Sequence, residues 1–154
     1  QAYGPRSGWS AIKAAALGDA REDRQRTVVP FFTLDQEIKL PDGRIVYPKG
    51  FTFNPLAFVK LRQRLVIARP ADLAWALRTA RSADFILMAA GQPGDADAIT
   101  LSERHGRSIF ILEERVKERL GLTVAPVVVT QTGQKLVLSE YGPSSRQALK
   151  GPAR

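Results

Sequence analysis

Few side chains in this sequence are suited to acid-base or covalent chemistry. The 154 residues include a single histidine, His105, which follows Ser102 and Glu103 near the end of a predicted helix. A serine, a carboxylate and a histidine are residue types found in hydrolytic sites. On a helix, only side chains three or four residues apart face each other, and of these three residues only Ser102 and His105 have that spacing. We interpret the spacing as chance and His105 as a solvated residue at the helix end.

The absence of cysteine excludes several classes of function. A chain without cysteine forms no disulfide, carries out no thiol redox chemistry and holds no thiolate-bound metal. A single histidine also excludes most other metal sites and catalytic triads. The sequence therefore predicts a protein that is not an enzyme and that has no catalytic residues, cofactor or metal.

Positive charge is concentrated in one part of the chain. The formal net charge is +8, and residues 43–71 contain six basic side chains and no acidic one. Cations beside stacking aromatic rings hold single-stranded nucleic acids, which makes nucleic-acid binding by segment 43–71 the alternative function. An acidic protein partner or a solvated face explains the same cluster. The basic residues are Arg44, Lys49, Lys60, Arg62, Arg64 and Arg69, and the aromatic residues among them are Tyr47, Phe51, Phe53 and Phe58.

Residues 1–26 are expected to form a flexible N-terminal arm. Glycines and Pro5 surround the short piece AIKAAAL, which indicates one or two helical turns. Trp9 lies in this polar segment, and such an aromatic side chain often docks onto its own domain or onto a partner. No apolar run approaches the ~18 residues of a membrane-spanning helix, so we expect no membrane insertion. The chain opens at Gln1 without a basic and apolar leader, as expected of a processed mature form or a fragment.

Residues 27–56 are predicted to be a β-hairpin or extended segment. The runs EIKL and RIVY flank a turn at Asp42 and Gly43, and Asp-Gly between two alternating runs is a strong hairpin signal. Pro30 interrupts the run TVVPFF, which is therefore expected to be an edge strand or irregular. The prolines and glycine of YPKGFTFNPL predict a second reversal that leads out of the hairpin.

Strands and helices alternate in residues 57–142. We expect strands at 64–68, 84–90 and 108–112, each followed by a helix, at 71–80, 95–106 and 113–121. A closing hairpin follows in APVVVTQTGQKLVLSE. The order is βαβαβαββ, and because βα crossovers require parallel strands while a hairpin is antiparallel, the predicted fold class is α/β with a mixed sheet. Residues 143–154 are expected to be a C-terminal tail.

The closing part of this pattern resembles thioredoxins. In LGLTVAPVVV a short helix ends at Gly121 and Pro126 opens the next strand, which is the place of the cis-proline in thioredoxins. The resemblance implies a thioredoxin-like domain over residues 57–142, with Pro126 as a structural cis-proline. The counterpart of the Cys-x-x-Cys loop lacks the thiolate that disulfide exchange needs. This degenerate loop is expected at Gly91, Gln92, Pro93 and Gly94.

A narrower resemblance covers about residues 27–140 and is carried by several motifs in order, among them Asp42-Gly43-Arg44, Asn54-Pro55-Leu56 and Val124-Ala125-Pro126. In these motifs the chain resembles the TraW family. TraW proteins are periplasmic components of F-type conjugative type IV secretion systems. The resemblance implies a non-catalytic periplasmic scaffold for assembly of the conjugative pilus, with a TrbC-like protein and other secretion components as partners. Family members usually carry an acidic turn where this chain has Ala68-Arg69-Pro70. The matching motifs are Asp42-Gly43-Arg44, Gly50, Asn54-Pro55-Leu56, Trp75-Ala76, Gly91, Leu120-Gly121 and Val124-Ala125-Pro126.

Aromatic residues outside the predicted core mark the expected partner interface. A few buried aromatic anchors supply most of the binding energy at many interfaces. Trp75, on the inner side of a predicted helix, is expected to belong to the core instead. The candidate interface residues are Trp9, Phe31, Phe32, Phe51 and Phe53.

Overall fold

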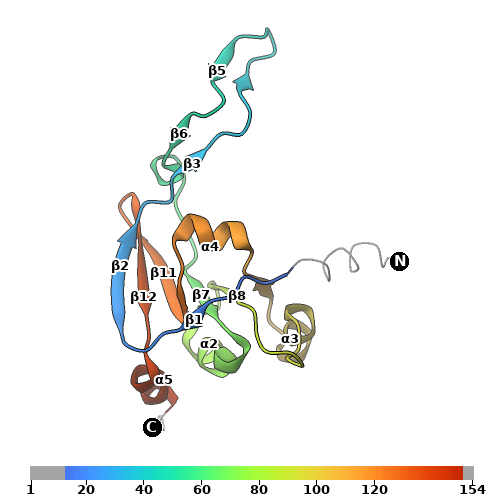
Figure 1. Cartoon of the computed structure of the whole chain (residues 1–154), viewed down its shortest axis with the longest axis vertical. Helices are drawn as coiled ribbons and strands as arrows, with labels where there is room; N and C mark the ends of the chain where they lie inside the picture. Colours follow the sequence, from blue (N-terminus) through green and yellow to red (C-terminus); the bar gives the residue numbers. More distant parts are fainter. Residues whose placement is uncertain (1–12, 151–154) are drawn as a thin grey trace, which may run out of the picture.

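The structure is a computed structural model, and it describes residues 13–150. These residues form a mixed α/β domain from which a narrow two-stranded arm projects (Figure 1). Within the described residues, the domain contains a six-stranded mixed sheet and four α-helices. No helix in this part of the chain is long and apolar enough to cross a membrane.

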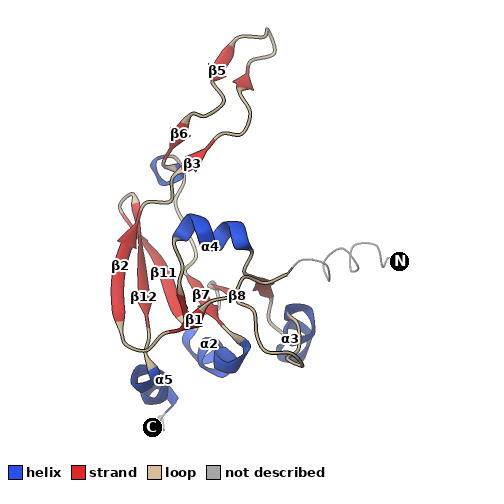
Figure 2. Ribbon diagram, viewed as in Figure 1, coloured by secondary structure: helices blue, strands red, loops and turns tan. Residues whose placement is uncertain are grey.

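The main sheet has the strand order β2-β12-β11-β7-β8-β9 (Figure 2). β7, β8 and β9 run parallel, whereas β11 is antiparallel to both β7 and β12, and β12 is antiparallel to β2. Val127 of β11 is paired with Ile67 of β7, so the start of β11 lies beside the end of β7. The six strands are β2 (Arg24–Val28), β7 (Leu65–Ala68), β8 (Phe85–Met88), β9 (Ile109–Ile111), β11 (Val127–Thr132) and β12 (Lys135–Glu140).

Helices cover both faces of the sheet. α2 and α3 pack on one face, where Trp75 and Leu101 are buried, and α4 packs on the other face, where Leu120 is buried. Neighbouring strand residues point to opposite faces, so Val66 belongs to the first core and Ile67 to the second. The helices are α2 (Leu73–Thr79), α3 (Ala98–His105), α4 (Glu114–Leu120) and α5 (Pro143–Lys150).

The predicted order βαβαβαββ is confirmed for β7, α2, β8, α3, β9, α4, β11 and β12. Trp75 is in the core, as expected, with 3% of its surface exposed. Two details differ. α3 begins at Ala98 instead of residue 95, because the Asp97 side chain accepts the Thr100 N–H at 2.8 Å and caps the helix there. β8 is not fully buried, since Phe85 packs against the exposed Phe110 on an uncovered part of the sheet.

The described part of residues 1–26 is not the flexible arm that we expected. Residues 13–17 have no helical structure, and Ala15, Leu17 and Ala20 are buried. β1 (Gly18–Asp19) pairs in parallel with the short strand β10 (Val124–Ala125). The alternation of Ala15 and Leu17 suits an extended chain that covers a core beside α4. β2 then joins the main sheet at its edge, and Pro30 follows its end, as expected of a strand interrupted by proline.

The C-terminal residues expected to be a tail begin with α5. The Gly142 N–H and the Ser145 hydroxyl donate hydrogen bonds to the Asp23 carboxylate, which caps the start of this helix. These two hydrogen bonds hold the pKa of Asp23 below its usual value, and the bond from Ser145 has the larger effect. Arg146 binds Asp72 at 3.0 Å and the carbonyl oxygen of Ala20 at 2.9 Å. α5 is therefore attached to both α2 and the N-terminal segment.

The arm, residues 31–53, is the predicted hairpin. β3 (Phe32–Thr33) pairs with β6 (Thr52–Phe53) near the domain, and β4 (Ile38–Lys39) pairs with β5 (Ile45–Tyr47) near the tip. The turn forms at the expected place, with Gly43 at φ 93°. The short 3-10 helix η1 (Pro55–Ala57) returns the chain to the domain. Figure 1 shows that the tip of the arm points away from the sheet and helices.

Candidate functional site

Cross-strand pairing places the apolar side chains of the arm on one face. Phe32 is paired with Phe53, and the next pair along is Thr33 with Thr52. Directly opposite side chains of an antiparallel pair lie on the same face, and successive pairs alternate between the two faces. The two threonine hydroxyls are joined by a hydrogen bond of 2.7 Å on the face opposite to the two phenylalanines. The arm therefore has an apolar face and a more polar one.

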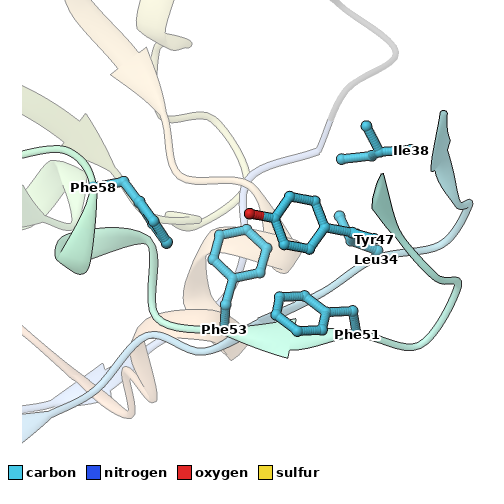
Figure 3. Close-up of a pocket in the computed structure, with 6 residues that line it drawn as sticks. All are labelled: Leu34, Ile38, Tyr47, Phe51, Phe53 and Phe58. Carbon is cyan, nitrogen blue, oxygen red and sulfur yellow. The ribbon is translucent and has the colours of Figure 1, made fainter. Parts of the chain in front are cut away.

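Aromatic rings on the apolar face contact one another in sequence. The ring centroid of Phe51 lies 4.9 Å from that of Tyr47 and 6.0 Å from that of Phe53, which lies 5.8 Å from Phe58. Phe58 follows η1, and Figure 3 shows it next to Phe53; together with the other labelled side chains it lines a hollow. The hollow, named here the arm pocket, has a volume of about 200 Å³. It is lined by Leu34, Ile38, Tyr47, Phe51, Phe53 and Phe58.

The arm and the adjoining residue Phe58 expose more apolar surface than a folded domain usually leaves uncovered. Phe58 is 72% exposed, Phe31 60% and Ile45 54%. A two-stranded hairpin is at best marginally stable without a surface to pack on, and large exposed apolar patches mark interaction sites. The apolar face of the arm is therefore the strongest candidate for a binding surface.

The base of the arm is fixed to the domain. The Asn54 side chain donates a hydrogen bond to the carbonyl oxygen of Gln134 at 2.8 Å, and Leu56 packs against the core beside α4. The guanidinium of Arg119 on α4 lies 4.4 Å from the ring centroid of Phe32, a cation–π contact. These contacts hold the apolar face in a defined orientation.

The structure brings together three of the five candidate interface residues. Phe32, Phe51 and Phe53 lie in the ring cluster, whereas Phe31 is exposed outside the arm pocket and Trp9 lies outside the described residues. Sequence reasoning missed two aliphatic members of the arm pocket, Leu34 and Ile38. The register of the hairpin determines which side chains share the face of the pocket. The turn at Asp42 and Gly43 is not enough to predict that register, because the pairing shifts near Ile38.

The basic segment 43–71 does not form one continuous cationic surface. Arg64 binds the buried Asp84 at 2.7 Å, Arg69 binds Asp19 at 2.6 Å, and Arg44 binds Asp42 at 3.0 Å. Half of the six cations are thus engaged with carboxylates, in three separate places. The sequence could not predict this, because two of the three carboxylates are distant in the chain.

Pro126 lies at a covered end of the sheet. The Ala125-Pro126 peptide bond is cis, and Pro126 is fully buried. The N-terminal segment pairs with the preceding strand, where the Ala20 N–H donates to the Ala125 carbonyl at 2.9 Å. Asp19 of this segment binds both Arg69 and Arg146. The chain itself therefore occupies the surface around this proline.

The loop Gly91 to Gly94 follows β8. In the sheet, β8 is separated from β11 by β7. It is a turn closed by Asp95, whose carboxylate accepts the Gln92 N–H at 2.7 Å. The turn after β7 begins with Arg69. It is nearer to Pro126 than the loop after β8 is, because β7 is the strand that pairs with β11. The helix expected from residue 95 begins at Ala98 and is capped by Asp97, so it does not follow this loop directly.

Ser102 supports the edge of the sheet. Its hydroxyl accepts the Ile109 N–H at 2.8 Å and lies within donor distance of the Ala98 and Ile109 carbonyl oxygens, at 2.8 and 3.1 Å. Because β9 is an edge strand, Ile109 has no strand partner on that side. His105 is exposed and is the last residue of α3, as expected. The hydroxyl of Ser102 therefore has a structural role at the sheet edge, and none of these hydrogen bonds involves His105.

Comparison with protein-family models, curated proteins and solved structures finds no match for this chain. Among the described residues, no group of three or more histidine, aspartate or glutamate side chains is placed to hold a metal ion.

Proposed function

We propose that this chain is a non-catalytic, thioredoxin-like interaction protein that contributes to assembly of the conjugative pilus in an F-type type IV secretion system. It acts in the periplasm and binds a TrbC-like partner through the arm. The observation that carries the proposal is the apolar face of the arm, which carries the arm pocket and projects from the folded domain. The sequence resemblance supplies the partner, and the exposed rings supply the surface.

The thioredoxin-like part of the proposal draws support from the sheet. Parallel strands β7, β8 and β9 are joined by helices, and the hairpin of β11 and β12 adds to β7. Pro126 stands immediately before β11 in the cis form. In a thioredoxin-like arrangement the turn that begins at Arg69 would be the counterpart of the Cys-x-x-Cys loop, in place of residues 91–94, because β7 is the strand beside β11.

The non-catalytic part of the proposal draws support from the same end of the sheet. In thioredoxins, clients dock over the active-site loop and the cis-proline. In this chain, ion pairs of Asp19 with Arg69 and Arg146 tie the N-terminal segment across that end. A partner therefore has a more accessible surface on the arm than around Pro126.

Calorimetric titration of the full chain with the purified TrbC-like protein of the same conjugative system tests the proposal. We expect the double substitution Phe51→Ser and Phe53→Ser to raise the Kd at least about tenfold, because it removes two anchors of the pocket. The matched control is Phe85→Ser with Phe110→Ser, since these rings are similarly exposed but lie on the main sheet. We expect the control to bind like the parent chain.

Substitutions in the loop after β8 test the opposite possibility, that the partner binds at this loop and not at the arm. Gln92→Ala and Pro93→Ala are expected to leave binding of the TrbC-like protein unchanged. If they abolish binding while the arm variants bind normally, docking through the arm is wrong. Circular dichroism of every variant separates lost binding from lost folding.

Nucleic-acid binding by segment 43–71 remains the alternative, with less support. Ion pairs engage Arg44, Arg64 and Arg69, so half of the cations of the segment already have carboxylate partners. A single-stranded oligonucleotide titrated at several salt concentrations distinguishes the two functions. Binding that weakens steeply with salt would favour the alternative, because it reports release of counterions from phosphates.

A further inference from the structure

The size of the arm pocket indicates what enters it. Its volume of about 200 Å³ is below the range of about 300 to 1,000 Å³ found for small-molecule and cofactor sites. Its lining consists of four aromatic and two aliphatic side chains, so the matching group is apolar. One large apolar side chain of a protein partner satisfies both conditions.

The apolar face of the arm is a better docking surface than its edges. Strand addition requires a regular row of free backbone groups. The arm has two short ladders of two residue pairs each, and the outer one contains a register shift between Ile38 and Lys39. An irregular edge is a poor template for another strand. A helix lying across the apolar face needs no backbone pairing and presents side chains every three or four residues.

The charges near the pocket favour an acidic occupant. Two of the three carboxylates of the arm are already paired, Glu37 with Lys39 at 3.3 Å and Asp42 with Arg44 at 3.0 Å, and the third, Asp35, lies with Lys39 and Lys49 around a separate hollow. In the described part of the chain, by contrast, no ion pair of 4.0 Å or less involves Lys49, Lys60 or Arg62. Lys49 lies between two residues that line the pocket, Tyr47 and Phe51, and the other two cations follow Phe58 closely in the sequence. The net charge of +8 also disfavours a second copy of this chain as the occupant.

We infer that the arm pocket receives a large apolar side chain from an amphipathic, acidic α-helix of the partner protein. The apolar stripe of the helix covers the rings, and its flanking carboxylates meet Lys60 and Arg62. This inference rests on the proposed function in one respect, namely that the arm binds a protein. It adds the chemical class of the segment that binds.

Two synthetic helical peptides of about 18 residues test this chemistry, a length at which an isolated helix begins to form in water. Both carry the same stripe of leucine and phenylalanine, and they differ only in having glutamate or lysine beside it. Fluorescence anisotropy measures their binding to the full chain. We expect the acidic peptide to bind at least about tenfold more tightly than the basic one, and more weakly as salt increases.

Variants of the chain locate the binding. Phe53→Ser should abolish binding of the acidic peptide, and Lys60→Glu with Arg62→Glu should weaken it at least about tenfold. Phe110→Ser, an exposed ring on the main sheet, is the control and should have no effect. Phe53 and the two cations lie outside the buried cores, so near-ultraviolet circular dichroism should remain that of the folded chain.

Three outcomes overturn the inference: equal binding of the two peptides, binding of the acidic peptide that survives Phe53→Ser, or no binding of either peptide. A fourth is that vesicles of phosphatidylglycerol bind in a Phe53-dependent manner while the acidic peptide does not, which would identify a membrane surface instead.

The TrbC-like protein is measured in parallel. If it binds through the arm and neither peptide does, only the helix chemistry fails. If the acidic peptide binds and the TrbC-like protein does not, the inference stands and the proposed partner fails.

Discussion

The side-chain amide of Asn54 donates a hydrogen bond of 2.8 Å to the carbonyl oxygen of Gln134, in the turn between β11 and β12. The same side chain accepts the N–H of Leu56 at 3.0 Å and so caps η1. Leu56 in turn packs against the core beside α4. The motif Asn54-Pro55-Leu56 is therefore the anchor of the arm, and it sets the direction in which the arm leaves the domain.

Replacement of Asn54 by Ala should lower the free energy of unfolding by about 1 to 2 kcal/mol, the usual cost of losing a capping side chain. It should also speed hydrogen exchange of the Gly50 N–H, which bonds to the Leu34 carbonyl within the arm. Urea unfolding and exchange measured by NMR check the two effects. Gln36→Ala, at an exposed position of the arm, is the control. Unchanged stability in the Asn54 variant would show that the anchor lies elsewhere.

Asp84 makes the stability of the domain depend on acid pH. Burial alone would raise the pKa of Asp84, but hydrogen bonds from the Arg64 side chain and the Arg81 N–H, with the charge of Arg64, outweigh it and lower the pKa. A carboxyl group whose pKa is lower in the folded state stabilises the fold above its unfolded pKa of about 3.9. That contribution is lost as the pH falls through the folded-state pKa. We therefore expect the parent chain to lose stability below about pH 4.

The substitution Asp84→Asn tests this assignment. At pH 7 it should lower the free energy of unfolding by about 1.5 to 3 kcal/mol, the range for hydrogen bonds to charged groups. As the pH falls from about 4 through the lower folded-state pKa, the difference from the parent chain should shrink, since the parent carboxyl group then becomes neutral, as the amide is at every pH. Asp42→Asn is the control, because its ion pair with Arg44 is exposed and such pairs contribute little. Urea unfolding from pH 2 to 7 measures both; a difference that stays constant with pH would contradict the role of Asp84.

Ser102→Ala should expose a backbone edge. The substitution leaves the Ile109 N–H without the hydroxyl that accepts it, so we expect a loss of about 1 to 3 kcal/mol in stability. An edge strand with unpaired backbone groups can also pair with a strand of another chain, so the variant should self-associate at high concentration. Urea unfolding and sedimentation measure the two effects. Ser139→Ala is the control, because its hydroxyl accepts an exposed hydrogen bond from Gln25; equal behaviour of both variants would remove the edge-protecting role.

The alternation of strands and helices was predictable because it depends on local periodicity. Residues 64–140 follow the expected order, and Gly106 and Gly121 end α3 and α4 with left-handed backbone, as their positions indicate. The ring cluster of the arm was predictable only in part. The turn at Asp42 and Gly43 is local, but which side chains share a face depends on a register that shifts along the hairpin.

The ends of the domain were not predictable, because their structure depends on distant contacts. The piece AIKAAAL has helical propensity, yet its described residues, 13–17, have no helical structure: Ala15 and Leu17 are buried in the core beside α4, and the next two residues pair with β10. Propensity is a weak preference that such tertiary contacts override. For α5 the signal was present, since Pro143 stands in its first turn, but its capping residue, Asp23, is far away in the sequence.

Gly91 should tolerate no side chain. A Cβ atom at this position would lie 2.4 Å from an Asp95 carboxylate oxygen and 2.6 Å from Cγ of Pro70. Gly91→Ala must therefore displace the proline ring or the turn, and we expect a loss of about 1 to 3 kcal/mol in stability. Gly18→Ala is the control, since its nearest neighbours would lie at an ordinary 3.6 Å. Thermal unfolding of both variants checks this; if they unfold alike, the packing of the two loops is looser than described.

The final prediction concerns the N-terminal segment. If residues 1–26 were a flexible arm, removing them would leave the domain folded. Instead, Leu17 is buried in the core beside α4, Asp19 pairs with Arg69 and Arg146, and Asp23 caps α5. Deletion of residues 1–23 removes all of these contacts at once, whereas deletion of residues 1–12 removes none of them. We expect the longer deletion to abolish cooperative unfolding or to lower the urea midpoint strongly.

A point substitution keeps this prediction measurable even if the longer deletion does not fold. Leu17→Ala should cost about 2 to 5 kcal/mol, as for other buried leucines, because it leaves a cavity between the N-terminal segment and the sheet. Lys13→Ala, at an exposed position of the same segment, is the control and should stay within about 0.5 kcal/mol of the parent chain. Urea unfolding in the full chain measures both. If Leu17→Ala and the deletion of residues 1–23 both retain the parent midpoint, the segment is not part of the core, and the surface around Pro126 is open to a partner after all.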